Sequence, residues 1–148
     1  MDLIEFLNAR LDEDEYAALP FHCMETGETD EWRCDEVGGA VRTVRTPPFG
    51  LSDVIAQSDI HAPAVHIARW DPARVLADVE AKRRTLSEHA PVESGAATGG
   101  YLCRVCLNPA TTGGWAEDWY PQTHPCQTVR LLALPFAAHP DYREEWRP

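Results

Sequence analysis

The sequence predicts an α+β fold that is mostly helical, in which a small β-hairpin packs on helices and a cysteine knuckle closes the C-terminal part. Three observations support this class. Two long segments carry apolar residues at helical spacing, two strand-like runs flank a Gly-Gly pair, and a Cys-x-x-Cys pair is followed by a third cysteine twenty residues later. We expect residues 1–90 to form a helical body with the hairpin, 91–100 a linker, and 101–148 the knuckle and a last helix, packed on the body as one domain.

The composition is that of an ordinary globular domain. The 148 residues are 44% hydrophobic and 25% charged, and five cysteines, an odd number, fit reduced thiols and metal binding better than a disulfide framework. The longest apolar run, residues 131–138, is too short to span a bilayer, and the N-terminus lacks the basic and apolar regions of a signal peptide. We therefore expect a cytoplasmic protein.

Acidic residues are concentrated near the start of the chain. Residues 1–36 contain twelve acidic residues against Arg10 and Arg33, a net charge of −10 out of −11 for the whole chain, so residues 37–148 contribute only −1. Such a segment repels a nucleic-acid backbone, which disfavours direct nucleic-acid binding. We expect it to be either a solubilising surface or a docking face for a basic protein partner.

The first predicted helix covers residues 2–18. Its apolar residues recur near helical spacing, and acidic residues fill the opposite face. Asp2 is placed to cap its N-terminus, and Glu5 three residues later completes a capping box. Pro20 marks its end.

Residues 31–37 and 40–45 are the predicted strands, and the two glycines between them form a permissive turn. A sheet this small must pack on helices to be stable. Cys34 in the first strand, and Cys23 before it, are expected to be small core residues.

The best-defined helix begins at Asp71-Pro72, where aspartate caps the N-terminus and proline takes the first helical position. A shorter helical segment, residues 64–70, precedes it. The Gly-, Ala- and Ser-containing residues 91–100 are typical of a flexible linker.

Three cysteines carry the strongest chemical signal. Cys103 and Cys106 form the Cys-x-x-Cys knuckle, and Cys126 stands directly before the last predicted helix. This spacing predicts a tetrahedral Zn²⁺ site whose arrangement resembles a treble clef. The spacing leaves the fourth ligand open: His89 at the end of the long helix is favoured, because it would tie both halves of the chain together, and His124 is the alternative.

Cys23 and His22 are the remaining candidates for the fourth ligand. The competing interpretation of the three cysteines is a set of buried structural thiols that binds no metal.

No catalytic residue is predicted. Cys23-Met24-Glu25 followed by the Cys-x-x-Cys pair superficially matches a zinc deaminase pattern, but Leu102 stands where that pattern has proline. A redox role for the Cys-x-x-Cys pair is disfavoured, because no βαβ unit is predicted around it. The sequence also contains no glycine-rich phosphate-binding loop.

Three segments, Met1–Glu15, His66–Arg84 and Pro125–Pro148, resemble a family of small uncharacterised proteins of streptomycetes, other actinobacteria and their phages. Members of that family carry a cysteine pair before a Pro-Cys-x-Thr helix and commonly a histidine after the long helix. The family implies no activity. The resemblance does imply one ligand unit, comprising His89, Cys103, Cys106 and Cys126.

Together these features predict a zinc-stabilised binding or adaptor protein, regulatory or phage-related, that uses its acidic face to bind a protein partner. The alternative is a zinc-dependent hydrolase with an open coordination position, for which Glu117 and Asp118 are the local candidates for a general base. Trp115 and Trp119, in the same segment, are expected to be either a lid over the metal or exposed recognition residues.

Overall fold

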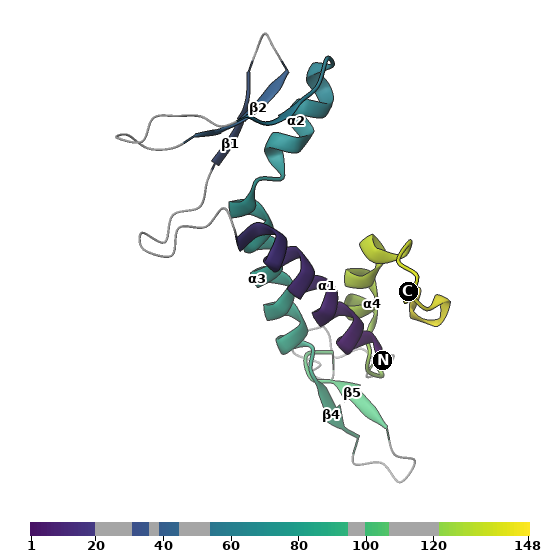
Figure 1. The fold of residues 1–148 in the computed structure, drawn as a ribbon. Coiled ribbons are helices and arrows are strands. Elements are labelled where there is room, and N and C mark those ends of the chain that lie inside the picture. The colour runs from purple at the N-terminus through teal and green to yellow at the C-terminus, as the bar shows by residue number, and fades with distance from the viewer. Residues whose placement is uncertain (20–30, 36–38, 45–53, 95–99, 107–121) are drawn as a thin grey trace, which may run out of the picture. The chain divides into compact units, whose positions relative to one another are not determined.

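The computed structural model describes residues 1–19, 31–35, 39–44, 54–94, 100–106 and 122–148. The fold is α+β, as predicted, and about half of the described residues are helical. In chain order the elements are α1 (Leu3–Ala18), β1 (Glu31–Cys34), β2 (Ala40–Val44), β3 (Val54–Gln57), α2 (His61–Arg69), α3 (Pro72–Glu88), β4 (Pro91–Glu93), β5 (Tyr101–Cys103), α4 (Gln127–Ala133) and the 3₁₀ turns η2 (Leu134–Phe136) and η3 (Glu144–Trp146) (Figure 1).

Two compact units divide the chain. Unit 1 comprises residues 1–11 and 80–148, and unit 2 comprises residues 12–79. Across the residues that the structure describes, no helix combines the length and the apolar character needed to cross a bilayer.

The start of α1 in unit 1 is closed by the predicted capping box. The backbone N–H of Glu5 donates to Oδ1 of Asp2 at 2.9 Å, and the backbone N–H of Asp2 donates to Oε2 of Glu5 at 2.8 Å. Both partners lie within one turn, so the sequence alone is sufficient to specify this contact.

An aromatic cluster around Phe6 holds the C-terminal segment against the first turns of α1. The Phe6 ring lies 5.0 Å from the ring of Trp146, 6.1 Å from Tyr142 and 6.3 Å from Phe136. Phe6 is fully buried and Trp146 is 5% exposed, so this cluster is the core of unit 1 together with Val129 of α4. The Phe6–Tyr142 and Phe6–Phe136 pairs are edge-on, a geometry that adds to the stabilisation from burial of their apolar area.

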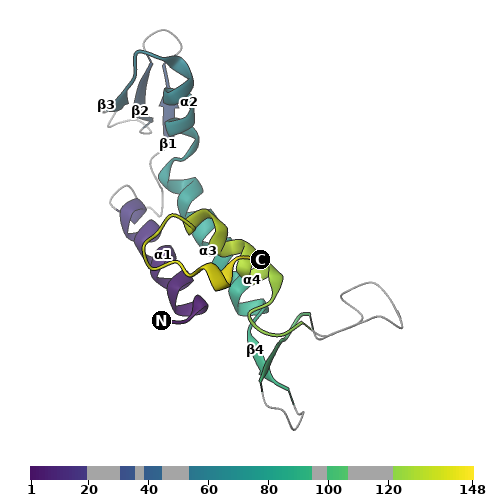
Figure 2. The same cartoon turned by 90° about the vertical axis from the view of Figure 1, so that its right-hand side faces the viewer.

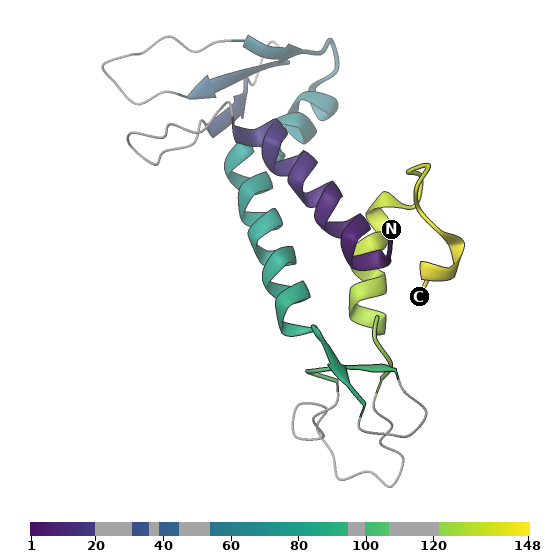
Figure 3. The ribbon, with the colours of Figure 1, turned by 60° about the horizontal axis from the view of Figure 1, so that its bottom comes forward.

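Strands β4 and β5 form a short antiparallel hairpin in which Pro91 pairs with Cys103 and Glu93 with Tyr101. Figure 3 shows this hairpin at the end of α3, next to the segment that leads into α4. Part of that segment joins the hairpin, because Thr123 bridges to Leu102. The sequence predicts a linker over residues 91–100 and gives no indication of the strands β4 and β5. Residues 95–99 of the predicted linker lie outside the described residues.

Unit 2 contains a three-stranded antiparallel sheet in the order β1-β2-β3 rather than the predicted two-stranded hairpin. Helix α2 packs along the sheet (Figure 2). Val41 and Thr43 of β2 and Ala64 of α2 are buried and form its core. The β2–β3 register shifts between Val41 and Arg42, and such an irregular partner strand leaves a weak period-two signal in the sequence.

Gly39 precedes β2 and has φ of +60°. A Cβ atom at this position would collide with the backbone carbonyl of Ser58. The two segments are held at this close approach by a hydrogen bond in which the Ser58 N–H donates to the Gly39 carbonyl at 3.1 Å. Both the backbone conformation and the close approach therefore require glycine. The other glycine of the pair, Gly38, lies outside the described residues.

Helix α3 begins as predicted. Oδ1 of Asp71 accepts a hydrogen bond from the backbone N–H of Arg74 at 2.8 Å, and Pro72 is the first helical residue. The guanidinium of Arg74 stacks over the ring of Trp70 at 4.3 Å, which closes the corner between α2 and α3.

Candidate metal centre

Four side chains of unit 1 converge on one point. Their ligand atoms, the Sγ atoms of Cys103, Cys106 and Cys126 and a ring nitrogen of His89, all lie within 4.8 Å of one another. The Nδ1 atom of His89 is 3.2 Å from the sulfur of Cys103, 3.4 Å from that of Cys126 and 3.8 Å from that of Cys106. A tetrahedral ion with metal–sulfur and metal–nitrogen bonds of ~2.3 and ~2.05 Å gives a sulfur–nitrogen edge of about 3.6 Å, so the group has the size of a metal site.

His89 is positioned by the last turn of α3. Its backbone N–H donates to the carbonyl of Thr85 at 3.0 Å, which continues the helical hydrogen bonds one residue beyond Glu88. Arg104 covers the same helix end, because its guanidinium donates to the carbonyls of Ser87 at 2.6 Å and Glu88 at 3.3 Å. Both contacts satisfy carbonyl groups that a helix C-terminus leaves without partners.

The knuckle cysteines come from the end of β5 and the turn that follows it. Cys103 is the last residue of β5 and is fully buried, and the turn through Arg104 brings Cys106 back toward it. The Arg104 N–H donates to the carbonyl of Ala90 at 3.0 Å, and the Cys103 N–H to that of Gln122 at 3.0 Å. The knuckle is therefore fixed on two sides by backbone hydrogen bonds.

Cys126 is the N-cap residue of α4. Its backbone is extended (φ −73°, ψ 172°), its carbonyl accepts the N–H of Arg130 at 3.1 Å, and its side chain makes no capping hydrogen bond. The sulfur is therefore directed to the other three ligand atoms instead of the helix backbone. Cys126 is 2% exposed.

The thiols of the cluster differ in acidity. Burial opposes ionisation of the Cys103 thiol, but hydrogen bonds from the backbone and thiol of Cys106 and from the thiol of Cys126 outweigh it, and the pKa of Cys103 is lowered. Burial, hydrogen bonding to Cys103 and the charges of Cys126 and Cys103 raise the pKa of Cys106 to about 12. Without a cation the cluster therefore retains a proton on Cys106, and three thiolates require a positive ion among them.

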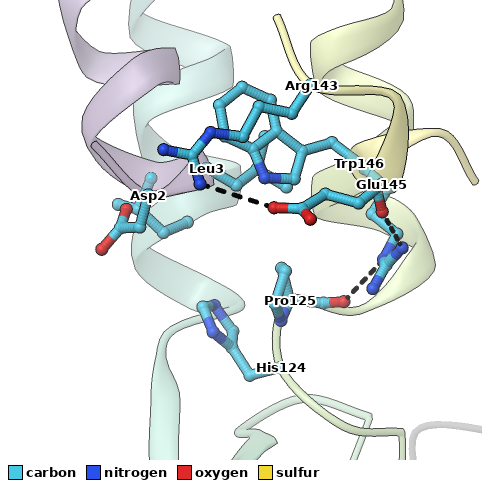
Figure 4. Close-up of a pocket in the computed structure, with 9 residues that line it drawn as sticks. Asp2, Leu3, His124, Pro125, Arg143, Glu145 and Trp146 are labelled. Atoms are coloured by element: carbon cyan, nitrogen blue, oxygen red, sulfur yellow. Dashed lines mark hydrogen bonds and ion pairs between the residues drawn. The ribbon is translucent and has the colours of Figure 1, made fainter.

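The structure distinguishes the two histidines that the spacing left open. His89 lies in the cluster, whereas His124 lines a cavity with Asp2, Pro125 and Trp146 (Figure 4). Burial lowers the pKa of His124, with opposing contributions from the charges of Asp2, which raises it, and His89, which lowers it further. His124 therefore remains a neutral ring next to the cluster.

Several predicted residues lie outside the described part of the chain, namely His22, Cys23, Trp115, Glu117, Asp118 and Trp119. Cys34 is described, and its prediction as a core residue is wrong. It is half-buried, and its sulfur lies 3.6 Å from Nδ1 of His61. β1 is an edge strand with a neighbouring strand on one side only, so even its less exposed face, which carries Trp32 and Cys34, is no more than half-buried.

The sequence did not indicate the cavity beside His124. The polar residues around it come from the start of α1, from α4 and from the last residues of the chain, and their local patterns are those of a capped helix and a charged tail. Within the tail, the charged run Arg143-Glu144-Glu145 is the local sequence feature that relates to the cavity. Their convergence depends on the Phe6 cluster, which brings the tail to α1.

No curated protein and no solved structure matches this chain. One family model matches residues 1–148, over the entire sequence, and its description states a family of unknown function. The chain belongs to this family of unknown function, DUF6221.

Proposed function

We propose that this protein is a zinc-stabilised binding protein of adaptor type, in which the metal holds the fold and a surface of the protein binds a regulatory partner. The observation that carries the proposal is the convergence of three thiols and one imidazole nitrogen within 4.8 Å. Sulfur and imidazole donors in a four-ligand set suit Zn²⁺ better than the oxygen-preferring cations.

The four-ligand set favours a structural zinc over a hydrolytic one. A hydrolytic zinc needs a coordination position for water, whereas the four protein atoms that lie within 4.8 Å of one another here would be sufficient to complete a tetrahedral ligand set. Two of the cysteines, Cys103 and Cys126, are buried. We therefore propose a treble-clef-like centre in which the β4–β5 hairpin and its turn supply the knuckle, α4 supplies Cys126 and α3 supplies His89.

We propose that the partner is a basic protein and that it binds the acidic surface of unit 2, defined as Asp12, Glu13 and Tyr16 on α1. Asp12 and Glu13 are exposed, and Tyr16 is 78% exposed. An exposed aromatic ring beside carboxylates supplies both an apolar anchor and electrostatic steering, which favours a partner with lysine and arginine at its contact surface. The net charge of −10 over residues 1–36 supports this choice.

The zinc centre is tested by metal analysis of the purified full-length chain together with X-ray absorption at the zinc edge. We expect one zinc per chain with three sulfur ligands and one nitrogen ligand. The His89→Ala variant should lose zinc, whereas the matched His124→Ala and Cys34→Ser variants should retain it. Absence of stoichiometric metal from the parent protein contradicts the proposal, and a water oxygen in place of the nitrogen supports the hydrolase alternative.

The acidic surface is tested with a defined lysine-rich polypeptide as the probe. Binding measured by calorimetry at low salt should fall at least tenfold in the Asp12→Lys/Glu13→Lys variant and weaken steeply with added salt. The matched control, Asp59→Lys/Glu93→Lys, makes the same change in net charge at exposed positions elsewhere. Equal losses in the two variants show that net charge alone acts, and they contradict a specific surface while leaving the zinc centre untouched.

A further inference from the structure

A cavity of about 390 Å³ lies in unit 1 between the start of α1, the segment before α4 and the C-terminal tail (Figure 4). This volume is within the range of small-molecule sites, which is ~300–1,000 Å³. The polar side chains around it are Asp2, His124, Arg130, Arg143 and Glu145. No side chain of the metal cluster lines the cavity, so it is a separate site from the metal centre.

The formal charges around the cavity cancel. Asp2 and Glu145 contribute two carboxylates, and Arg130 and Arg143 contribute two guanidinium groups. A simple anion would be attracted by the arginines but repelled by the carboxylates. A metal cation would be attracted by the carboxylates but repelled by the arginines. The charge pattern therefore favours a ligand that carries one group of each sign.

The two arginines are held differently. Arg130 is fixed, because its guanidinium donates to the carbonyls of Glu145 at 2.9 Å and Pro125 at 3.1 Å. Arg143 reaches a carboxylate oxygen of Glu145 only at 3.5 Å, and both of these side chains are more than half exposed. In Figure 4 this pair spans the cavity opposite His124. A long and exposed ion pair can exchange its partners for those of a ligand at little cost.

The opposite wall offers an unused hydrogen-bonding atom. Nε2 of His124 is buried and makes no hydrogen bond with any described residue. Buried polar atoms without a partner are rare in folded proteins, and a bound group is one of their ordinary explanations. His124 is attached to the metal centre through Pro125 and Cys126, so the position of this wall depends on the cluster.

An apolar surface completes the cavity. Trp146 lies against it and is held from behind by the rings of Phe6 at 5.0 Å and Tyr142 at 5.8 Å. Leu3 and Pro125 also line the cavity. A rigid indole and two aliphatic groups suit an apolar substituent of modest size.

We propose that this cavity binds a small zwitterion of the amino-acid class, a free α-amino acid with an apolar side chain. Its carboxylate pairs with Arg143, its ammonium group pairs with Asp2 and Glu145, and its side chain packs against Trp146 and Leu3. Nε2 of His124 hydrogen-bonds to one of the polar groups. The inference does not rest on the proposed acidic surface, and it uses the metal centre only as the support of His124.

The experiment uses the metal-loaded full-length chain and leucine as the probe, followed by two-dimensional NMR. Leucine should shift the signals of Asp2, Arg143 and the Trp146 indole in a saturable manner. Isoamylamine and 4-methylpentanoate, which lack the carboxylate and the ammonium group respectively, should each bind about tenfold or more weakly, because a charge-assisted hydrogen bond is lost. Equal binding of leucine and either analogue, or no saturable shift with leucine, overturns the proposal.

Matched variants test the assigned partners. Arg143→Gln should weaken leucine binding at least tenfold, whereas Arg147→Gln, whose side chain pairs with Glu144 and does not line the cavity, should leave it unchanged. Asp2→Asn retains an N-cap side chain but removes the charge. It should weaken leucine binding but strengthen the binding of 4-methylpentanoate, which has no ammonium group and is repelled by the Asp2 carboxylate in the parent protein. Unchanged leucine affinity in both Arg143→Gln and Asp2→Asn overturns the assignment, provided that metal content and NMR dispersion match the parent protein.

Discussion

Each of the two units of this protein is stabilised internally by a different kind of interaction. Unit 1 combines the four-residue ligand cluster with an aromatic core around Phe6, whereas unit 2 relies on a three-stranded sheet whose core is formed by small and β-branched residues such as Val41, Thr43 and Ala64. A sheet of this size buries little apolar area, and its ion pairs, Arg33 with Glu31 and Arg42 with Asp35, are exposed. Unit 1 therefore depends on a few strong side-chain interactions between segments distant in the chain, whereas unit 2 depends on the backbone geometry of its sheet.

The largest expected effect is the loss of the cluster. Cys103→Ser should abolish zinc binding and cost unit 1 more stability than any other single change, because the free energy of metal binding contributes directly to the folding of zinc domains. In two-dimensional NMR recorded on heating, the signals of Phe6 and Val129 should lose their dispersion at a lower temperature than in the parent protein, while those of Val41 and Ala64 in unit 2 melt as before. Cys34→Ser is the control and should change neither unit. Unchanged melting of the unit 1 signals without metal would show that the aromatic core alone is sufficient.

The second effect tests that aromatic core directly. Phe6→Ala should lower the free energy of unfolding by about 3–5 kcal/mol, because a fully buried ring in contact with the rings of Phe136, His139, Tyr142 and Trp146 is removed. Denaturant unfolding of the metal-loaded protein measures this loss. Tyr16→Ala, at a position that is 78% exposed, should change stability by no more than about 0.5 kcal/mol. A similar small loss in Phe6→Ala would mean that the metal carries nearly all the stability of unit 1.

The third effect concerns the backbone geometry of unit 2. Gly39→Ala should cost at least about 2 kcal/mol, since it combines an unfavourable positive φ with a collision against the Ser58 carbonyl. Gly100→Ala in unit 1 tests a positive φ without a collision, because Gly100 has a φ of +120°, farther than Gly39 from the left-handed region that L residues can reach, and its Cβ would meet open space. We expect Gly39→Ala to cost at least as much as Gly100→Ala, although its φ is the less unfavourable of the two. A clearly smaller loss at Gly39, measured by thermal unfolding, would show that the Ser58 contact adds nothing.

The smallest effect is a pH dependence confined to unit 1 of the metal-free protein. The folded-state pKa of Cys106 is raised from 9.0 to about 12, so between these values the folded chain keeps a proton that the unfolded chain has lost. Stability should therefore fall as pH rises through this window. The lowered pKa of Cys103 acts in the opposite sense: its contribution is present above the unfolded pKa and is lost as pH falls through the folded pKa.

Melting temperatures of the metal-free protein between pH 8 and about pH 11 measure this dependence. The metal-free Cys106→Ser variant supplies the background from the other titrating groups, and the metal-loaded protein should lack the effect because its thiols are already ionised. The same slope in all three samples would assign the pH dependence to groups outside the cluster.

Features that depend on neighbours in the chain were predictable. The capping box of Asp2 and Glu5 and the Asp71 cap of α3 involve residues three positions apart, so their hydrogen bonds are specified by the sequence once a helix forms. The knuckle of Cys103 and Cys106 is similar, since two ligands three positions apart share one turn. The strands β4 and β5 were not predictable, because runs of three residues carry too little periodicity to be recognised.

The candidate site was predictable only in part. Soft donors at metal-ligand spacing indicate zinc chemistry in any fold, but the choice between His89 and His124 depends on where α3 ends relative to α4. The cavity lined by Asp2, Arg143 and Trp146 joins the two ends of the chain, which no local pattern connects.

By itself, the sequence determined the α+β class, the helix caps and the set of thiols that a soft metal would select, because these follow from local hydrogen bonding and donor chemistry. Only the tertiary structure decided which histidine joins the thiols, that a third strand completes the sheet, and that charges from both termini surround one cavity. The physical reason is that these features arise from packing between segments distant in the chain, and the residues of one segment alone do not determine the free energy of that packing.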